Sequence, residues 1–314
     1  MTVPMLTRRH FMVALAAASL PSVASAGTPR IVATTGMIAD AARQISGLDV
    51  AALMGPGMDP HGHRATRNDI LALSRADLVL WHGLNLEAQL VTLMGDLAAR
   101  KPVLAVAESL PKDVLLAKPD HPDRPDPHVW FAPDLWSEVT RAVEAAVLPF
   151  APDAAERAKA YRAEIAMMGA YAAQVLATVP AEARVLVTAH DAFSYFGRVF
   201  GFQVEGVQGI STESEAGLVR IGALVDLLVT RRIPAVFVES SVSDRSIRAL
   251  VEGAAARGHA VAIGGELFSD AMGPDGSYEG TWLGMLDHNA TVIARALGGT
   301  APDRGANGRL GVAG

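Results

Sequence analysis

The chain has 314 residues, of which 50% are hydrophobic and 19% are charged. This composition is typical of a globular protein with one large domain or two medium-sized ones, and it excludes collagen-like and low-complexity classes. The formal net charge is −6 and no stretch is strongly basic, which argues against a nucleic-acid partner. The chain contains no cysteine, so any metal site must use nitrogen and oxygen ligands.

Residues 1–26 follow the order of an export signal. Arg8 and Arg9 give a basic start, an apolar run follows, and Ala24-Ser25-Ala26 fits an A-x-A cleavage motif. The apolar run is shorter than the ~20 residues that a membrane-spanning helix needs, and the paired arginines resemble a twin-arginine signal. We therefore expect cleavage near Ala26 and a periplasmic protein. Because a lipid anchor would require a cysteine, we expect the mature protein to carry none.

Short apolar runs alternate with helical segments from residue 27 to residue 151. Helical patterns lie near 37–46 and near 68–76, where Asn68 is a candidate N-cap. We expect strands at 30–35, 49–54, 77–83 and 102–107. Strands that alternate with helices over short connections form parallel sheets covered by helices. Residues 27–151 are therefore predicted to form an N-terminal α/β lobe.

A long helix is predicted between the two halves of the mature chain. Residues 152–180 are rich in Ala, Glu, Arg and Met, with Pro152 at a position that suits a first helical turn and Pro180 at the end. Such a helix would join two lobes as a rigid backbone. Residues 181–297 repeat the α/β pattern, with strands expected within 184–193, 234–241 and 259–265 and helices at 243–258 and 288–297. The glycine-rich segment 298–314 is predicted to be a disordered tail.

Three histidines and an aspartate lie in loops next to the predicted strands. His61, His190 and Asp270 each follow a strand, and His128 lies in a proline-rich loop of the first lobe. Loops of this kind converge on the ligand site of open α/β sheets. The tripeptide Asp-Pro-His occurs both at 59–61 and at 126–128, where proline stiffens the backbone and aspartate can accept a ring N–H or hold the loop. On residue types alone, two capped loops with solvent-exposed histidines remain the alternative.

Six stretches in a fixed order carry a stronger signal. They are GPGMDPHGHRAT, DPHVWFAPDLW, VLVTAHDAFSYFGRVFGF, VQGISTESEA, PAVFVESS and GGELFSDAMG. Together they resemble the zinc- and manganese-binding (cluster A-I) solute-binding receptors of ABC transporters, over residues 30–297. The resemblance implies two α/β lobes joined by one rigid backbone helix, with a metal ion between them. Carried over by motif, the metal ligands would be His61, His128, His190 and Asp270.

The remaining histidines fit this ligand set less well. His63 stands where the family often has tyrosine, so we expect it to support a ligand or to lie at the surface. His121 is the single histidine of a loop where many zinc-dedicated relatives carry a long histidine-rich insert. His82, His259 and His288 are expected to be structural.

Three imidazoles and one carboxylate suit zinc in tetrahedral geometry. Manganese or iron becomes possible if Asp270 binds through both oxygens and the geometry relaxes. The resemblance points both ways, because manganese-dedicated members often have glutamate where this chain has His190, whereas the short loop around His121 lacks the insert of zinc-dedicated members. We expect zinc first and manganese next.

The expected function is capture of a divalent metal ion by a periplasmic monomer and its delivery to an ABC permease driven by a cytoplasmic ATPase. An exported zinc-dependent hydrolase is the alternative from another class. A catalytic zinc normally has three protein ligands and an open position for water, and the chain has no G-x-S-x-G motif. Glu205 and Glu239 are the candidates for proton transfer in that case, although Glu239 is better explained as a support near the lobe interface. A metal-binding adhesin is a further alternative. We expect a receptor and not an enzyme.

Overall fold

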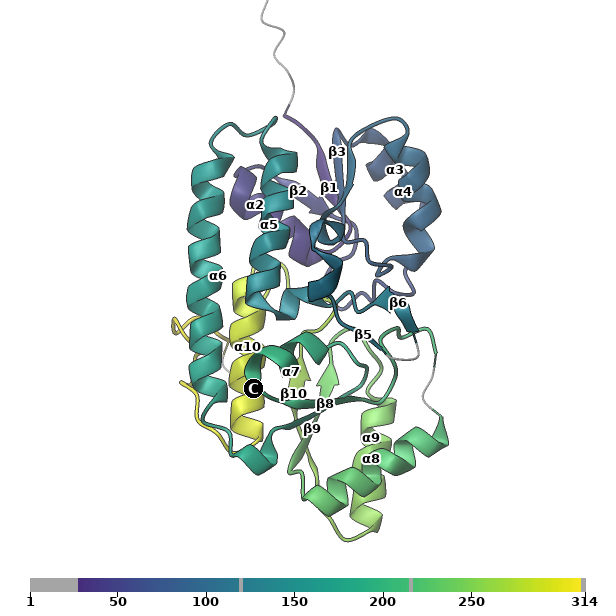
Figure 1. Ribbon diagram of the computed structural model, residues 1–314, viewed down its shortest axis with the longest axis vertical. Coiled ribbons are helices and arrows are strands. Elements are labelled where there is room, and N and C mark those ends of the chain that lie inside the picture. Colours follow the sequence, from purple (N-terminus) through teal and green to yellow (C-terminus); the bar gives the residue numbers. More distant parts are fainter. Residues whose placement is uncertain (1–27, 119–120, 215–216, 312–314) are drawn as a thin grey trace, which may run out of the picture.

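The computed structural model describes residues 28–118, 121–214 and 217–311. Two lobes are stacked along the long axis of the molecule, and a long helix, α6 (Ala154–Leu176), runs beside both of them (Figure 1). The N-terminal lobe precedes this helix in the chain and the C-terminal lobe follows it. This is the two-lobed α/β architecture that the sequence predicts. The predicted export signal, 1–26, lies outside the described residues.

A four-stranded parallel sheet lies at the centre of the N-terminal lobe. Its strands are β1 (Ile31–Ala33), β2 (Val50–Ala52), β3 (Leu78–Trp81) and β4 (Val103–Ala105), in the order β2-β1-β3-β4. The helices are α2 (Gly36–Ser46), α3 (Arg67–Arg75), α4 (Val91–Ala98) and α5 (Pro133–Val147). Successive strand residues point to opposite faces, so Ile31 and Ala33 pack with α2 and α5, whereas Val32 packs with α3 and α4. Helices therefore cover both faces of the sheet.

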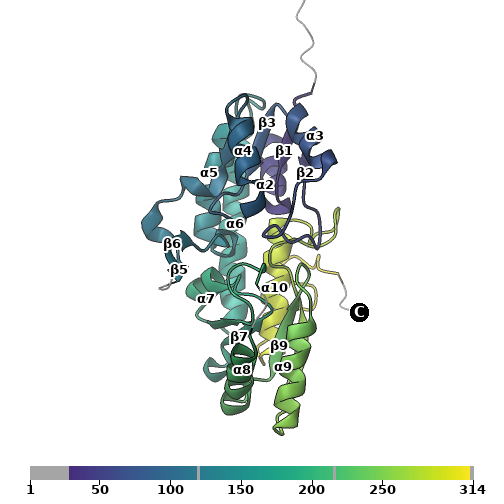
Figure 2. The same ribbon diagram turned by 90° about the vertical axis from the view of Figure 1, so that its right-hand side faces the viewer.

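The lobes are linked by α6. The helix begins after Asp153, with Pro152 in the preceding turn, and its last residue is Leu176, so it is shorter at both ends than the predicted 152–180. Its 23 residues correspond to ~34 Å of helix. One face is buried against α5 and α10 (Trp282–Ala296), which runs alongside α6 (Figures 1 and 2). None of the helices in the described part of the chain combines the length and the apolar composition needed to cross a bilayer.

The C-terminal lobe contains two pairs of parallel strands. They are β7 (Val185–Thr188) with β8 (Gln203–Gly206), and β9 (Ala235–Glu239) with β10 (Ala262–Leu267). The helices are α7 (Ser194–Phe200), α8 (Leu218–Arg231), α9 (Arg245–Ala256) and α10. β7 lies next to β9, so the two pairs are neighbours within the lobe. The last helix begins at Trp282, earlier than the predicted 288, because the Thr281 side chain caps it by accepting the N–H of Gly284.

One hydrophobic core runs through both lobes. At their junction the rings of Phe131 and Phe193 are stacked, with centroids 4.4 Å apart. The indole N–H of Trp130 donates to the carbonyl of Ser269, and the indole N–H of Trp282 donates to the carbonyl of Trp130. Because a close-packed core does not deform continuously, a wide rotation of one lobe against the other would break these contacts.

The glycine-rich segment after α10 is packed against the protein over its described part, 298–311, in contrast to the predicted disordered tail. Leu310 is only 4% exposed, and the backbone N–H of Ala306 donates to both carboxylate oxygens of Asp287. Gly305 adopts a positive φ of 70° beside that carboxylate, where a Cβ would lie 2.4 Å from an oxygen. Here glycine permits close backbone packing, so a composition typical of disorder accompanies an ordered segment.

Candidate metal centre

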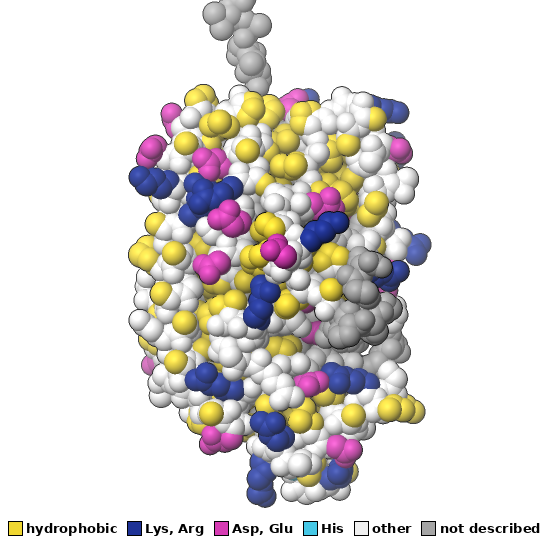
Figure 3. All heavy atoms as spheres, in the orientation of Figure 1, with side chains coloured by type: hydrophobic (Ala, Val, Ile, Leu, Met, Phe, Trp, Pro, Cys, Tyr) yellow, Lys and Arg dark blue, Asp and Glu magenta, His cyan; other side chains and the backbone are white. Residues whose placement is uncertain are grey.

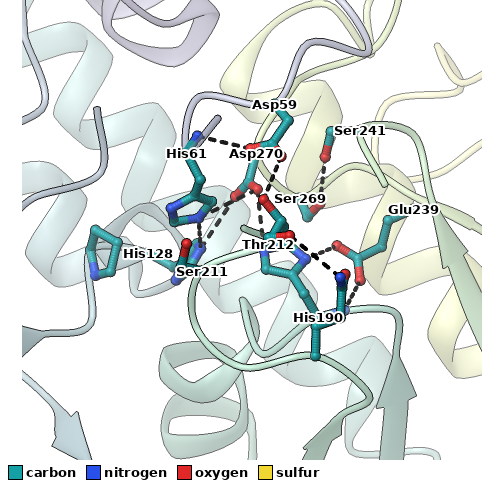
Figure 4. Close-up of polar contacts among 12 residues, drawn as sticks. Asp59, His61, His128, His190, Ser211, Thr212, Glu239, Ser241, Ser269 and Asp270 are labelled. Atoms are coloured by element: carbon teal, nitrogen blue, oxygen red, sulfur yellow. Dashed lines mark hydrogen bonds and ion pairs between the residues drawn. The ribbon is translucent and has the colours of Figure 1, made fainter. Parts of the chain in front are cut away.

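Four side chains from four loops meet where the lobes face each other (Figure 4). His61 and His128 come from the N-terminal lobe, in the turn after β2 and just before a 3-10 helix. His190 and Asp270 come from the C-terminal lobe, shortly after β7 and β10. All four are buried. The structure thus brings together the four residues that the resemblance implies as ligands, because loops at the carboxyl ends of parallel strands converge.

We call His61, His128, His190 and Asp270 the cage. Their donor atoms are spaced like the ligands of one small ion. One nitrogen or oxygen from each of the four residues lies within 4.8 Å of the others. His61 Nε2 lies 3.4 Å from His128 Nε2, and Asp270 Oδ2 lies 3.1 Å from His190 Nε2 and 3.7 Å from His61 Nε2. Metal–ligand bonds of ~2.0–2.1 Å in a tetrahedron separate the ligand atoms by ~3.4 Å. The cage therefore has the dimensions of a zinc-type site.

Asp270 presents both carboxylate oxygens to the imidazoles. Oδ2 faces His190 and His61, while Oδ1 lies 3.3 Å from His128 Nε2. Its oxygens accept no well-aligned hydrogen bond from the described residues, so their partners are the imidazole nitrogens, which carry positive charge only when protonated. A buried carboxylate is costly without a cation beside it, either a protonated imidazole or a metal ion. The arrangement fits a metal ion that is bound by one or both oxygens of Asp270.

The two Asp-Pro-His turns hold their histidines in different ways. In both turns the aspartate accepts the backbone N–H of the histidine, at 2.8 Å for Asp59 and His61 and at 3.0 Å for Asp126 and His128. Asp126 Oδ1 also lies 2.6 Å from His128 Nδ1, which turns Nε2 of that ring toward the cage. The second oxygen of Asp59 instead accepts a hydrogen bond from the hydroxyl of Thr212, in the C-terminal lobe.

Glu239, the last residue of β9, supports His190 from behind. One carboxylate oxygen accepts the backbone N–H of His190 at 2.9 Å, and the other lies 2.7 Å from Nδ1 of its ring. Nε2 is thereby left to face Asp270. This geometry agrees with a supporting role for Glu239 rather than proton transfer. Glu205, the other candidate for proton transfer, is paired with Arg220.

Burial and neighbouring charges shift the ionisation of the cage. Burial, together with the charges of His128 and His190, lowers the pKa of His61 to about 4. Burial also opposes protonation of His128, but Asp126 and Asp270 outweigh it and raise the pKa of His128 to about 9. Glu239 and Asp270 likewise hold the pKa of His190 well above its ordinary value, against burial. The neighbouring imidazoles hold the pKa of Asp270 well below its usual range despite its burial. A cation that binds between these side chains would meet an anionic carboxylate and would compete with protons on His128 and His190.

The other histidines with described side chains contact groups outside the cage. His63 Nε2 lies 3.2 Å from Asp69 Oδ2, in the capping box at the start of α3. His82 is fully buried and donates to the carbonyl of Pro127. The rings of His259 and His288 contact backbone carbonyls. The side chain of His121 lies outside the described part of the chain.

Comparison with known proteins identifies the family. Residues 31–296 match the family of the periplasmic zinc-uptake complex component A, ZnuA. The chain belongs to the ZnuA family. It is 45% identical over 274 residues to the manganese-binding lipoprotein MntA of Bacillus subtilis, covering 85% of this chain and 89% of MntA. It is 44% identical over 280 residues to the zinc-binding protein TroA of Treponema pallidum, covering 87% and 90% of the two chains.

A solved structure supports the ZnuA-family fold. The periplasmic zinc-binding TroA of Treponema pallidum superimposes with a TM-score of 0.84 at 43% identity, covering 86% of this chain and 99% of that one. The resemblance seen in the motifs and the two-lobed fold are thereby confirmed. ZnuA-family membership makes the chain a substrate-binding transport protein and excludes the hydrolase alternative.

Proposed function

We propose that this ZnuA-family protein binds one divalent transition-metal ion between its lobes and delivers it to an ABC importer. The observation that carries the proposal is the cage of His61, His128, His190 and Asp270, whose donor atoms lie within 4.8 Å of one another. Each lobe contributes two of the four residues, so a bound ion ties the lobes together. TroA and MntA are themselves named for binding zinc and manganese.

We favour zinc as the cargo, with manganese next and iron third. Three neutral imidazoles and one carboxylate form the borderline donor set that zinc accepts in a closed tetrahedron. At a given site of nitrogen and oxygen ligands, zinc also binds more tightly than manganese or ferrous iron. Both oxygens of Asp270 face the three imidazoles, which would permit a higher coordination number. Manganese therefore remains a candidate for the cargo. The chain is almost equally similar to TroA and to MntA, so these identities do not choose between the metals.

Release of the ion is proposed to involve the ligand loops rather than a wide swing of the lobes. The core is continuous between the lobes, and the stacked rings of Phe131 and Phe193 lie at the junction. Rotation would have to break this packing, whereas the turn of His61 lies outside the described hydrophobic core of the two lobes and is held by the hydrogen bond from its backbone N–H to Asp59. Local movement of one loop therefore costs less than rotation of a lobe.

The proposed partners are an inner-membrane permease with its cytoplasmic ATPase, and the proposed compartment is the periplasm, reached through the signal predicted at 1–26. MntA is named a lipoprotein, whereas this sequence contains no cysteine. We propose that the protein acts in the periplasm as a monomer. On the face shown in Figure 3, Lys and Arg side chains are scattered among acidic and hydrophobic ones and form no continuous basic patch. That surface is compatible with the absence of a nucleic-acid partner.

Calorimetric titration of the metal-free protein with zinc and with manganese tests the proposal. We expect one ion per chain, and we expect His190→Ala to abolish most of the affinity. His259→Ala is the matched control, because that ring hydrogen-bonds to the carbonyl of Ile233 and is not one of the four cage residues. Absence of binding in the wild type, or equal affinities in the two variants, would contradict the proposal. The metal content of protein taken from its native compartment then identifies the cargo, with zinc expected.

A further inference from the structure

A cleft of about 700 Å³ opens beside the cage. His61 and Pro127 line it from the N-terminal lobe, and residues 204–211 line it from the C-terminal lobe. His61 is the one cage residue in this lining, and it is 3% exposed, whereas His128 and His190 are 0% exposed. An ion that reaches the cage through this cleft therefore meets His61 first.

The segment 207–214 follows β8 on one wall of the cleft. Its first residues, 207 and 208, form a fixed base. The backbone N–H groups of Val207 and Gln208 donate to the carbonyls of Thr188 and Ala189, so the ladder between β7 and β8 continues into the segment. Gly206 lies so close to Asp191 that a Cβ on it would be 2.4 Å from a backbone nitrogen. The base of the segment cannot move without breaking this packing.

Thr212 and Glu213, which form the tip of the segment, are held by side chains of the N-terminal lobe. The hydroxyl of Thr212 donates to Asp59 Oδ2. Gln89 Nε2 donates to Glu213 Oε1 at 2.8 Å. Asp59 Oδ1 meanwhile holds the backbone N–H of His61 at 2.8 Å. One carboxylate thus joins a segment of the C-terminal lobe to a ligand turn of the N-terminal lobe, as Figure 4 shows for Asp59, Thr212 and His61.

We propose that these two hydrogen bonds, Thr212–Asp59 and Gln89–Glu213, form a latch that sets the rate at which metal enters and leaves the cage. The inference rests on the proposed metal-binding function. When the latch opens, the tip of segment 207–214 moves away from the cleft and the turn of His61 loses one of its supports. The core between the lobes stays closed throughout. Thr212 is therefore a positioning residue that acts on the cage through Asp59.

The contrast between the two Asp-Pro-His turns supports this role. Asp126 holds both the backbone N–H and the ring of His128, so that ligand is fixed within its own turn. One oxygen of Asp59 accepts the backbone N–H of His61, and the other accepts the hydroxyl of Thr212 instead of contacting the ring of His61. The second turn is tied to the opposite lobe through its backbone, because the carbonyl of Asp126 accepts the hydroxyl of Tyr195. Among the described residues, only the first turn reaches that lobe through its aspartate side chain, and only its histidine lines the cleft, which is the arrangement expected of a gated ligand.

Stopped-flow kinetics of metal exchange test the latch. Zinc-loaded protein is mixed with excess EDTA, and metal-free protein is mixed with zinc. Thr212→Val removes the donor while keeping the shape of the side chain, and we expect release and uptake both to become about tenfold faster, as for loss of one hydrogen bond to a charged group. Because both rates rise, the equilibrium affinity changes less than either rate. Thr212→Ser restores the donor and is expected to restore wild-type rates.

Ser74→Ala is the control, because the hydroxyl of Ser74 donates to the carbonyl of Leu71 at an exposed position of α3, outside the lining of the cleft, and it is expected to leave both rates unchanged. Gln89→Leu tests the second hydrogen bond from an exposed position and carries the test if Thr212→Val fails to fold. Wild-type rates in both latch variants would overturn the inference. So would faster release with unchanged uptake, because Thr212 would then only stabilise the bound state. Absence of zinc binding in the wild type would instead overturn the proposed function.

Discussion

Oε2 of Glu239 lies 2.7 Å from Nδ1 of His190, while Oε1 of the same carboxylate accepts the backbone N–H of that histidine. The two contacts fix both the position of the residue and the rotation of its ring. A carboxylate behind Nδ1 also makes Nε2 a better electron donor and leaves it free for a metal. Glu239 therefore governs how His190 can act as a ligand, although it does not face the centre of the cage.

Glu239→Gln is expected to weaken zinc binding by about 10- to 100-fold, the usual effect of losing an outer partner of a metal-bound histidine. The variant keeps the shape of the side chain but loses its charge, so His190 is less strongly held in the required tautomer. Zinc affinity measured by competition with a chelator checks this prediction. Glu205→Gln is the control, because Glu205 is paired with Arg220 outside the cage. Equal zinc affinities for the two variants would show that Glu239 does not support His190 as a ligand.

Zinc affinity is expected to fall as the pH falls. The pKa of His128 is raised to about 9 and that of His190 is raised well above its ordinary value in the metal-free protein. A bound metal requires neutral imidazoles, so binding near neutral pH releases protons, and each proton displaced weakens binding by about tenfold per unit of falling pH. Calorimetry in buffers of different ionisation enthalpy counts the protons released. An affinity that is constant between pH 7.5 and pH 5 would argue against a site with three histidines.

The metal-free protein is expected to lose stability in acid through His82. Burial lowers the pKa of His82 to about 3, against about 6.5 in an unfolded chain. Between pH 6.5 and pH 3 the imidazole of His82 is protonated in the unfolded state but neutral in the folded state. The contribution of His82 to the free energy of unfolding is therefore complete above pH 6.5 and falls by about 1.4 kcal/mol per pH unit as the pH drops toward 3. Urea unfolding of the wild type and of His82→Gln at pH 7 and pH 4, with EDTA present, checks it. The wild type should lose more stability over this range, and identical losses would contradict the assignment.

The packed segment at 298–311 is expected to contribute to stability. Leu310 is 4% exposed, and Leu310→Ala should lower the free energy of unfolding by about 2 kcal/mol, at the small end of the range for buried leucines. Met167 is 65% exposed, so Met167→Ala serves as a control with an expected change within about 0.5 kcal/mol. Denaturant unfolding gives both values. A Leu310→Ala variant as stable as the control would mean that the segment is not packed in solution.

The sequence predicts most of the strands because their signals are local. β1, β3 and β9 are short apolar runs, whereas β8, which is not such a run, is not predicted. The two Asp-Pro-His tripeptides make His61 and His128 candidates, and the family resemblance then implies all four ligands. None of these positions depends on a contact that only the folded chain reveals.

The features that the sequence does not predict depend on distant partners or on caps. The link between Thr212 and Asp59 joins residues that are 153 positions apart, and no local pattern indicates it. The start of α3 is set by Thr66, whose side chain forms a capping box with Asp69, rather than by Asn68. Ordering of the glycine-rich segment depends on the buried carboxylate of Asp287, which composition alone cannot show.

A crystal structure of the zinc-loaded protein with anomalous data at the zinc edge shows whether the four side chains share one ion. We expect a single strong anomalous peak between the lobes, bonded to Nε2 of His61, His128 and His190 and to Asp270 at ~2.0–2.2 Å. A peak bound elsewhere, or one that touches fewer than three of these side chains, would contradict this expectation.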